Sequence, residues 1–295
     1  MKIAFLFPGQ GSQFAGMGKE LAEAHTVARQ TMEEADEVLG FSLSHLCYEG
    51  PEEELRRTEN TQPALVATSV AAWRVLEANG EAQPDFVAGH SLGEYSALVA
   101  AGALHFADAL RLVRLRGQFM QEAVPEGVGA MAAILKMPFE KLGDVLREAA
   151  QGEIVSAANL NSPDQIVIAG HQGAVARAME LAKSAGAKRC VLLPVSAPFH
   201  CALMWPAQDK MRPALEATEF ADLRVPLVNN VAAKIITTGA AAREGLIEQI
   251  PNAVRWVESV VRLKEEGVTA FREVGAGKVL TGLVRQITSD LTPIS

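Results

Sequence analysis

Cysteine and positive charge are both scarce in this sequence, and each shortage excludes a class of protein. The three cysteines, Cys47, Cys190 and Cys201, are too few and too far apart for a disulfide framework, which favours a reducing compartment. The 27 Lys and Arg residues are outnumbered by 35 Asp and Glu residues, which gives a net charge of −8. General nucleic-acid binding needs a basic surface, so we expect no nucleic acid as a partner.

Long hydrophobic runs are also missing. No apolar run reaches the ~18 residues that cross a membrane. In the stretch MKIAFLFPGQ, Pro8-Gly9 ends the first apolar run before it reaches the ~7–15 residues that a signal peptide needs. We therefore expect a cytoplasmic protein without a membrane segment. Its apolar content of 49% over 295 residues is enough for a sizeable core.

What the sequence does contain is an alternation of strand-like and helix-like segments. Residues 2–7 (KIAFLF) form a short apolar run, and residues 61–80 and 105–124 have helical periodicity. Residues 85–104 predict a strand, a tight turn and a helix. This alternation is typical of an α/β fold with a mostly parallel sheet, which resumes late in the chain with RVPLVNNV (224–231) and a helix after Ala240.

The pattern changes after Pro125. GAMAAILKM, EIVSAANLNSPDQIVIAG and AKRCVLLPV are strand-like, and they alternate with helical stretches at about 138–151 and 172–186. This β-α-β-β-α-β order is that of a ferredoxin-like unit. We therefore predict an inserted ferredoxin-like subdomain at 126–195, within an α/β body formed by 1–125 and 196–295.

The segment GHSLG at 89–93 fits G-x-S-x-G, in which a serine lies on a sharp turn between a strand and a helix. The flanking glycines let the backbone bend and leave the hydroxyl of Ser91 uncrowded. An ordinary turn with a helix-capping serine would look the same in sequence. The position of Ser91 between a predicted strand and a predicted helix favours a nucleophile.

A serine nucleophile needs a base to accept its proton. His171 and His200 each follow a predicted strand, and the chemistry would allow either. We prefer His200 because the chain re-enters the α/β body there, at the edge where parallel sheets build sites. His90 is next to Ser91, but consecutive residues leaving a strand point to opposite sides, so we expect it to pack beneath the turn. Asp164 would fit the Ser–Asp–His order of an α/β-hydrolase, although it lies in the inserted subdomain.

Two further features bear on chemistry at Ser91. The loop PGQGSQ has glycines on both sides of Gln10, so the N–H groups of Gln10 and Leu92 are candidates for an oxyanion hole. On the helix at 105–124, Arg116 has only apolar residues three and four positions away. A buried guanidinium requires an anion, which is either a substrate carboxylate or an internal Asp or Glu.

Six segments together resemble the malonyl-CoA:acyl carrier protein transacylases of bacterial type II fatty acid synthesis. In chain order they are FLFPGQGSQ, TQPAL, GHSLGEYSAL, RLRGQFMQ, APFHCALM and VGAGKVLTGL, and they extend over essentially the whole chain. Six co-linear motifs are far more specific than G-x-S-x-G alone. The resemblance implies an α/β-hydrolase-like large domain with a ferredoxin-like small one and no metal or tightly bound cofactor. We also expect a monomer.

The resemblance implies a role for each matched position. Ser91 is implied as the acylated nucleophile and His200 as its base. The main-chain carbonyl of Gln249 is implied to hold the histidine, which removes the need for Asp164. The remaining implied roles are the oxyanion hole, from the N–H groups of Gln10 and Leu92, and the malonyl-binding pocket, from Arg116, Gln62, Asn161 and Phe199.

Two positions depart from common patterns of that family. Ala253 stands where relatives often have proline, beside the segment that is implied to hold the histidine. Phe199 stands where some relatives have serine. A bulky residue there resembles the malonyl-selective type, because a ring leaves less room for an α-methyl group.

The implied reaction moves a malonyl group from malonyl-CoA to the phosphopantetheine thiol of acyl carrier protein through a malonyl-serine. The alternatives are a discrete malonyl transferase of polyketide synthesis, a serine hydrolase or thioesterase, and a non-catalytic carrier-binding module. Carrier proteins of this kind are acidic, as this chain is, so docking needs a local basic patch. The candidates for that patch are Lys188, Arg189 and Arg285.

Overall fold

A computed structural model describes residues 1–81, 83–195 and 197–294. Its strands are β1 (Lys2–Phe7), β2 (Phe86–Gly89), β3 (Gly129–Leu135), β4 (Val155–Ser162), β5 (Gln165–His171), β6 (Arg189–Leu192), β7 (Leu227–Val228), β8 (Ile235–Ile236), β9 (Val268–Glu273) and β10 (Thr292–Pro293). Its helices are α1 (Lys19–Ala24), α2 (Thr26–Leu39), α3 (Leu43–Glu49), α4 (Glu52–Arg56), α5 (Thr58–Ala78), α6 (Gly93–Ala100), α7 (Phe106–Glu122), α8 (Leu142–Ala150), α9 (Gln172–Ser184), α10 (Trp205–Ala217), α11 (Gly239–Gln249), α12 (Trp256–Glu265) and α13 (Val279–Ile287), with 3₁₀ turns at Phe139–Lys141 and Ala202–Met204.

The larger sheet has the strand order β10-β9-β1-β2-β7-β8. Every neighbouring pair in it is parallel except β7 and β8. The expected α/β fold with a mostly parallel sheet is therefore confirmed. Within 224–231, however, only Leu227–Val228 forms a strand that extends the parallel part of the sheet.

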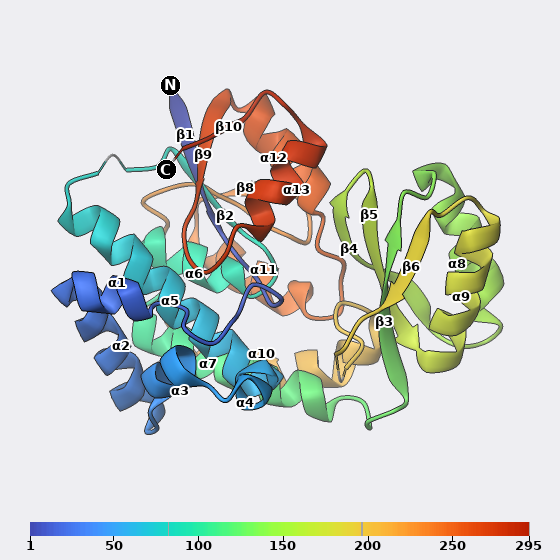
Figure 1. Ribbon diagram of the computed structural model, residues 1–295, viewed down its shortest axis with the longest axis horizontal. Coiled ribbons are helices and arrows are strands. Elements are labelled where there is room, and N and C mark those ends of the chain that lie inside the picture. The colour runs from blue at the N-terminus through green and yellow to red at the C-terminus, as the bar shows by residue number, and fades with distance from the viewer. Residues whose placement is uncertain (82, 196, 295) are drawn as a thin grey trace.

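Helices cover both faces of this sheet, as the alternation of side chains along β1 requires. Phe5 and Phe7 belong to the larger hydrophobic core, where Phe5 packs edge-on against Trp73 of α5. Ala4 and Leu6 point the other way, into a second core that includes residues of α12 and α13. Figure 1 shows the first seven helices on one side of β1 and β2, and α12 and α13 on the other.

The smaller sheet has the order β4-β5-β3-β6, and all its pairs are antiparallel. It stands at one end of the molecule, with α8 and α9 on its outer face (Figure 1). The predicted β-α-β-β-α-β order is present over 129–192. The boundary expected at 196 and the chain end at 295 fall on residues outside the described part, so the exact division stays a prediction.

The two sheets are joined next to the loops that follow the parallel strands. Asn159 of β4 forms a parallel bridge with Val254, and the N–H of Leu160 donates to Val254 O at 2.9 Å. Segments that follow β1, β2 and β7 lie at the carboxyl edge of the larger sheet, where α/β proteins place their sites. The smaller sheet therefore forms a wall beside that edge.

No helix in the described ranges is long and apolar enough to cross a membrane.

Candidate active site

The turn that carries Ser91 depends on its two glycines. A Cβ on Gly89 would lie 2.0 Å from backbone atoms of Gly93, and a Cβ on Gly93 would lie 2.2 Å from Phe7 O. Neither position has room for a side chain. Ser91 itself has φ +51°, a left-handed conformation that costs free energy for a residue other than glycine. The sequence pattern thus produces a strained turn that presents the hydroxyl at the end of β2.

Ser91, His200 and Gln249 form a hydrogen-bonded chain. The Oγ atom of Ser91 lies 2.7 Å from Nε2 of His200, and His200 Nδ1 lies 2.9 Å from the main-chain oxygen of Gln249. Because a carbonyl only accepts, Nδ1 carries the proton and Nε2 is free to accept one from the serine. The Gln249 carbonyl is in place although Ala253 follows it. Asp164 lies elsewhere, with its carboxylate 3.8 Å from Lys136.

Burial keeps the imidazole of His200 neutral. Burial, together with the positive charge of Arg116, lowers the pKa of His200 to about 3, although the Gln249 carbonyl acts in the opposite direction. A neutral imidazole is the form that accepts a proton. The ring is therefore a base throughout the neutral pH range.

Arg116 is a buried cation whose hydrogen bonds all go to neutral oxygens. Only 2% of its surface is exposed. Its Nη1 donates to Gln62 Oε1 at 2.8 Å, and its Nη2 donates to Ser91 Oγ at 3.1 Å and to Gln249 Oε1 at 2.9 Å. Its Nε has no partner among the described residues. No carboxylate of the described chain forms an ion pair with it, which disfavours an internal Asp or Glu as its direct anion.

Two residues that sequence reasoning missed hold the turn from below. Asn230, which follows β7, accepts from the N–H of Ser91 at 2.7 Å and donates to Gly89 O at 2.6 Å. Glu94, in the first turn of α6, accepts from the N–H of Asn230 and from Gln249 Nε2, both at 3.0 Å. A carboxylate inside the apolar helix GEYSALVA was a sequence signal for Glu94. Asn230 had none, because its partners in the turn and in α6 are 136 to 141 residues away.

The site opens into a cavity of about 110 Å³. This is small beside the roughly 300–1,000 Å³ of sites for drug-sized ligands, so a short acyl group fits it better than a long chain. The cavity is bounded by groups from both sheets: Gln10, Gln62, His90, Ser91, Arg116, Met120, Met131, Asn159, Leu193, Val195, Phe199 and His200.

The two expected oxyanion donors come from the loop after β1 and from the start of α6. Leu92 immediately follows Ser91 at the start of α6, where helix N–H groups have no partner within the helix. Gln10 lines the cavity, and its side chain donates to Thr58 Oγ1 at 3.3 Å. The neighbouring Gly11 N–H is used within the loop, by Gln13 Oε1. This arrangement leaves the N–H groups of Gln10 and Leu92 as the candidates.

His90 and Asn161 lie together beside the cavity. The ring of His90 packs edge-on against the buried Trp256, but it also lines the cavity. Its Nε2 lies 2.8 Å from Asn161 Oδ1, and Asn159 of the same strand as Asn161 lines the wall. The register of β4 against β5 shifts between Ala157 and Asn159, a local irregularity that sequence periodicity does not reveal.

The candidate docking residues lie away from the cavity. Arg189 begins β6 opposite Leu135, which in turn lies opposite Gln165 at the start of β5. At the same end of the smaller sheet, Ser162 donates to Gln286 of α13, the neighbour of Arg285. Lys188, Arg189 and Arg285 therefore belong to one end of the smaller sheet and the adjoining helix.

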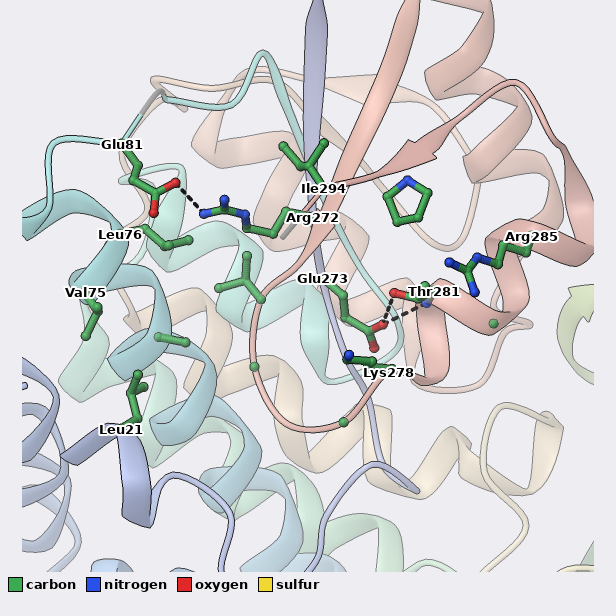
Figure 2. A pocket seen from close by; sticks show the side chains of 16 residues that line it. Leu21, Val75, Leu76, Glu81, Arg272, Glu273, Lys278, Thr281, Arg285 and Ile294 are labelled. Carbon is green, nitrogen blue, oxygen red and sulfur yellow. Dashed lines mark hydrogen bonds and ion pairs between the residues drawn. The ribbon is translucent and has the colours of Figure 1, made fainter. Parts of the chain in front are cut away.

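A larger cavity of about 740 Å³ lies between α5 and the β9–α13 region. Figure 2 shows that its carboxylates are already used: Glu81 pairs with Arg272, and Glu273 binds Thr281. Glu273 also accepts from the N–H of Leu280, so the start of α13 is satisfied. Among the described residues, its lining contains no histidine or cysteine and no nucleophile–base pair.

Comparisons with known proteins agree with this geometry. The Acyl transferase domain family matches residues 4–294. A malonyl CoA-acyl carrier protein transacylase of Escherichia coli is 52% identical over 291 residues, which cover 99% of this chain and 94% of that protein. The protein of the same description from Bacillus subtilis is 54% identical over 295 residues, which cover 100% of this chain and 93% of that one.

Solved structures resemble the chain as closely. An acyl carrier protein S-malonyltransferase from Vibrio cholerae has a TM-score of 0.97 at 50% identity, covering 99% of this chain and 96% of its own. A malonyl-transacylase solved in complex with its type II PKS acyl-carrier protein has a TM-score of 0.97 at 52% identity, covering 99% and 95%.

Proposed function

This chain belongs to the malonyl-CoA:acyl carrier protein transacylases, and from that premise we propose how its buried serine site transfers malonyl from coenzyme A to acyl carrier protein. The observation that carries the proposal is the distance of 3.1 Å between the hydroxyl of Ser91 and a buried guanidinium that forms no direct ion pair with a carboxylate of the described residues. A nucleophile beside a cation without a direct carboxylate partner suits an acyl group that ends in a carboxylate. Malonyl thioesters have that structure.

The first half-reaction acylates Ser91. His200 Nε2 accepts the hydroxyl proton while Oγ attacks the thioester carbonyl carbon. The N–H groups of Gln10 and Leu92 stabilise the negative charge that develops on the carbonyl oxygen. When the tetrahedral intermediate collapses, the carbon–sulfur bond breaks, and coenzyme A leaves as a thiol with the proton from His200.

The second half-reaction reverses these roles. His200 Nε2 accepts the proton of the phosphopantetheine thiol, whose sulfur attacks the malonyl-serine carbonyl. Ser91 Oγ then leaves and regains the proton. One base therefore serves both halves of a ping-pong reaction. In each half the Gln249 carbonyl keeps Nδ1 protonated, so that Nε2 stays the reactive nitrogen.

Selectivity for malonyl follows from the cavity walls. The planar guanidinium of Arg116 holds both oxygens of the free carboxylate, and Gln62 orients its Nη1. Phe199, which is 8% exposed, occupies the wall where an α-methyl group would lie. The pocket thus selects a short acyl group with a terminal carboxylate and disfavours a methyl branch.

Intact-protein mass spectrometry after mixing with malonyl-CoA tests the proposal. We expect one malonyl adduct on Ser91, with one equivalent of thiol released when no carrier is present. Ser91→Ala should give no adduct while its melting temperature stays close to that of the parent. Continuous thiol release without carrier would instead identify a hydrolase, and no adduct at all would contradict the proposal.

Carrier docking is assigned to Lys188, Arg189 and Arg285. None of the three forms an ion pair within the described residues, unlike many cations of this acidic chain. These cations at one end of the smaller sheet attract an acidic carrier locally, although the net charge of −8 makes the molecule as a whole repel it.

Charge reversal tests this docking surface. Lys188→Glu with Arg189→Glu should raise the KM for the carrier by about tenfold at low salt, less at high salt, and spare acylation by malonyl-CoA. Arg147→Glu with Lys183→Glu, on α8 and α9, is the control with the same change in net charge. An unchanged KM in the first variant at low salt would place the surface elsewhere.

The remaining question is whether the enzyme serves fatty acid synthesis or polyketide synthesis. Fatty acid synthesis follows from the motif resemblance, and the relative in complex with a type II PKS acyl-carrier protein favours polyketide synthesis as the second candidate. Comparison of kcat/KM for purified carriers of both pathways decides between them.

We further infer an α/β-hydrolase-like body, supported by the parallel sheet and its strained serine turn, and a ferredoxin-like subdomain, supported by the antiparallel order β4-β5-β3-β6. The monomeric state, the cytoplasmic location and the absence of a tightly bound cofactor stay predictions.

A further inference from the structure

Glu94 is a buried carboxylate to which the reaction steps above assign no role. Its surface is 0% exposed, and it lies three residues after the nucleophile on α6. One of its oxygens, Oε2, accepts both available hydrogen bonds, from the N–H of Asn230 and from Nε2 of Gln249. The other oxygen, Oε1, has no partner among the described residues. A buried carboxylate with a bare oxygen is costly, so its retention calls for a reason.

The side chain of Gln249 supplies that reason. Its amide has two chemically different ends that are interchangeable in shape. The nitrogen end donates to Glu94 Oε2 and to Ser91 O, each at 3.0 Å. The oxygen end accepts from Arg116 Nη2 at 2.9 Å. If the amide were reversed, its N–H groups would face the N–H groups of Arg116, and two donors would repel each other.

We propose that Glu94 is a positioning residue for acyl selectivity: by accepting from Gln249 Nε2, it fixes the amide so that an oxygen always faces Arg116. The guanidinium is thereby held with its remaining N–H groups available to a carboxylate-bearing acyl group. This inference rests on the proposed function, because it concerns the selectivity of that same site. The effect on selectivity comes from the length of the Glu94 side chain and its ability to accept a hydrogen bond, rather than from its charge.

Because Oε1 of Glu94 has no partner among the described residues, the positioning role does not need the negative charge of this side chain. Burial raises the pKa of Glu94 to about 7, against the opposing influence of Arg116 and of its two hydrogen bonds. A proton added on Oε1, beside Gly245, leaves Oε2 free to accept as before. Among the described residues, the groups that face Glu94 are the cation Arg116 from α7, the phenol of Tyr95 on its own helix and the neutral amides of Asn230 and Gln249.

Two substitutions separate reach from charge. Glu94→Gln keeps the length and one acceptor oxygen but loses the charge. Glu94→Asp keeps the charge but is shorter by one methylene, about 1.5 Å. The measurement is the ratio of kcat/KM for malonyl-CoA to that for acetyl-CoA, taken with the melting temperature of each variant. Since leaving a buried donor without its acceptor costs about one to two powers of ten, Glu94→Asp, which no longer reaches Gln249 Nε2, should lower the ratio about ten- to hundredfold.

The Gln variant should keep the ratio within about threefold of the parent. The ratio of the parent protein should also stay constant from pH 6 to 8, across the titration of Glu94, and this readout needs no variant to fold. An equal fall of both substrates in Glu94→Asp would show a purely structural role and overturn the proposal. A ratio lost in Glu94→Gln, or one that changes through pH 7, would show that charge acts instead and would also overturn it.

The parent protein separates this failure from that of the proposed function. If it forms no malonyl-serine, the function itself is wrong. If it forms malonyl-serine normally while Glu94→Asp keeps its ratio, only the positioning role of Glu94 is wrong.

Discussion

The two cavities described above differ in chemistry, and the smaller one has the chemically active groups. The larger, at about 740 Å³, has its carboxylates satisfied: Glu81 pairs with Arg272, and Glu273 caps α13, while Lys278 and Arg285 in its lining are exposed to solvent. The smaller, at about 110 Å³, contains a nearly fully buried arginine whose hydrogen bonds, among the described residues, all go to neutral oxygens. A site is therefore marked by buried polar groups that the fold leaves without a partner of opposite charge, and cavity volume by itself carries no chemistry.

Loss of the base, His200, should have the largest effect on malonyl transfer at the smaller cavity. His200→Ala should slow acylation and carrier transfer together, by about 10²–10⁴-fold, because general base catalysis has that typical magnitude. Single-turnover measurement of each half-reaction checks this. A variant that slowed only one half would show that a second base serves the other.

Loss of Arg116 should have the next largest effect, and this effect should depend on the acyl group. Leaving a buried carboxylate without its partner costs about 3–5 kcal/mol, so Arg116→Ala should lower malonyl transfer by about two to four orders of magnitude. Acetyl transfer should fall little, or rise, because acetyl has no carboxylate to leave unpaired. Arg116→Lys should recover only part of the malonyl activity. An unchanged malonyl-to-acetyl ratio with a lowered melting temperature would mean that Arg116 stabilises the fold alone.

The same arginine should shape the pH profile. A histidine base is active when neutral, and its activity is lost as pH falls through its pKa. Burial and Arg116 hold the pKa of His200 at about 3. Single-turnover acylation should therefore be flat from pH 8 to pH 5, where a histidine with its ordinary pKa of about 6.5 would have lost most of its activity. In Arg116→Ala the acid limb should move to higher pH. An acid limb centred near pH 6.5 in the parent would contradict the buried, neutral base.

A change in the larger cavity should have the smallest effect. Glu81→Gln removes a partly exposed ion pair, which is worth about 0–1 kcal/mol, so the melting temperature should fall by about 2 °C or less. Malonyl transfer should not change. A loss of transfer of more than about tenfold would show that the two cavities act together.

The sequence and the structure agree best where the signal is local. The turn at Ser91 could be predicted because only glycine fits at positions 89 and 93, where a Cβ would lie as close as 2.0 Å to the backbone. Such a requirement is visible in the sequence as two glycines at a fixed spacing. The burial of Arg116 could be predicted because helical period places its neighbours. The place of Asn159 in the cavity wall was not predicted, because the register of β4 against β5 is irregular and such an irregularity has no counterpart in residue spacing.

By itself the sequence determined the α/β class, the β-α-β-β-α-β order of the smaller sheet, the sharp turn at Ser91, the buried arginine and, through six co-linear motifs, the family. Tertiary structure alone decided that Arg116 has no direct counter-ion among the described residues, that Glu94 and Asn230 support the turn, and that Asn159 of β4 lines the cavity. The physical reason is distance along the chain. Periodicity and turn chemistry act over a few residues, whereas the hydrogen bonds of this site join positions up to 158 residues apart, which only folding brings together.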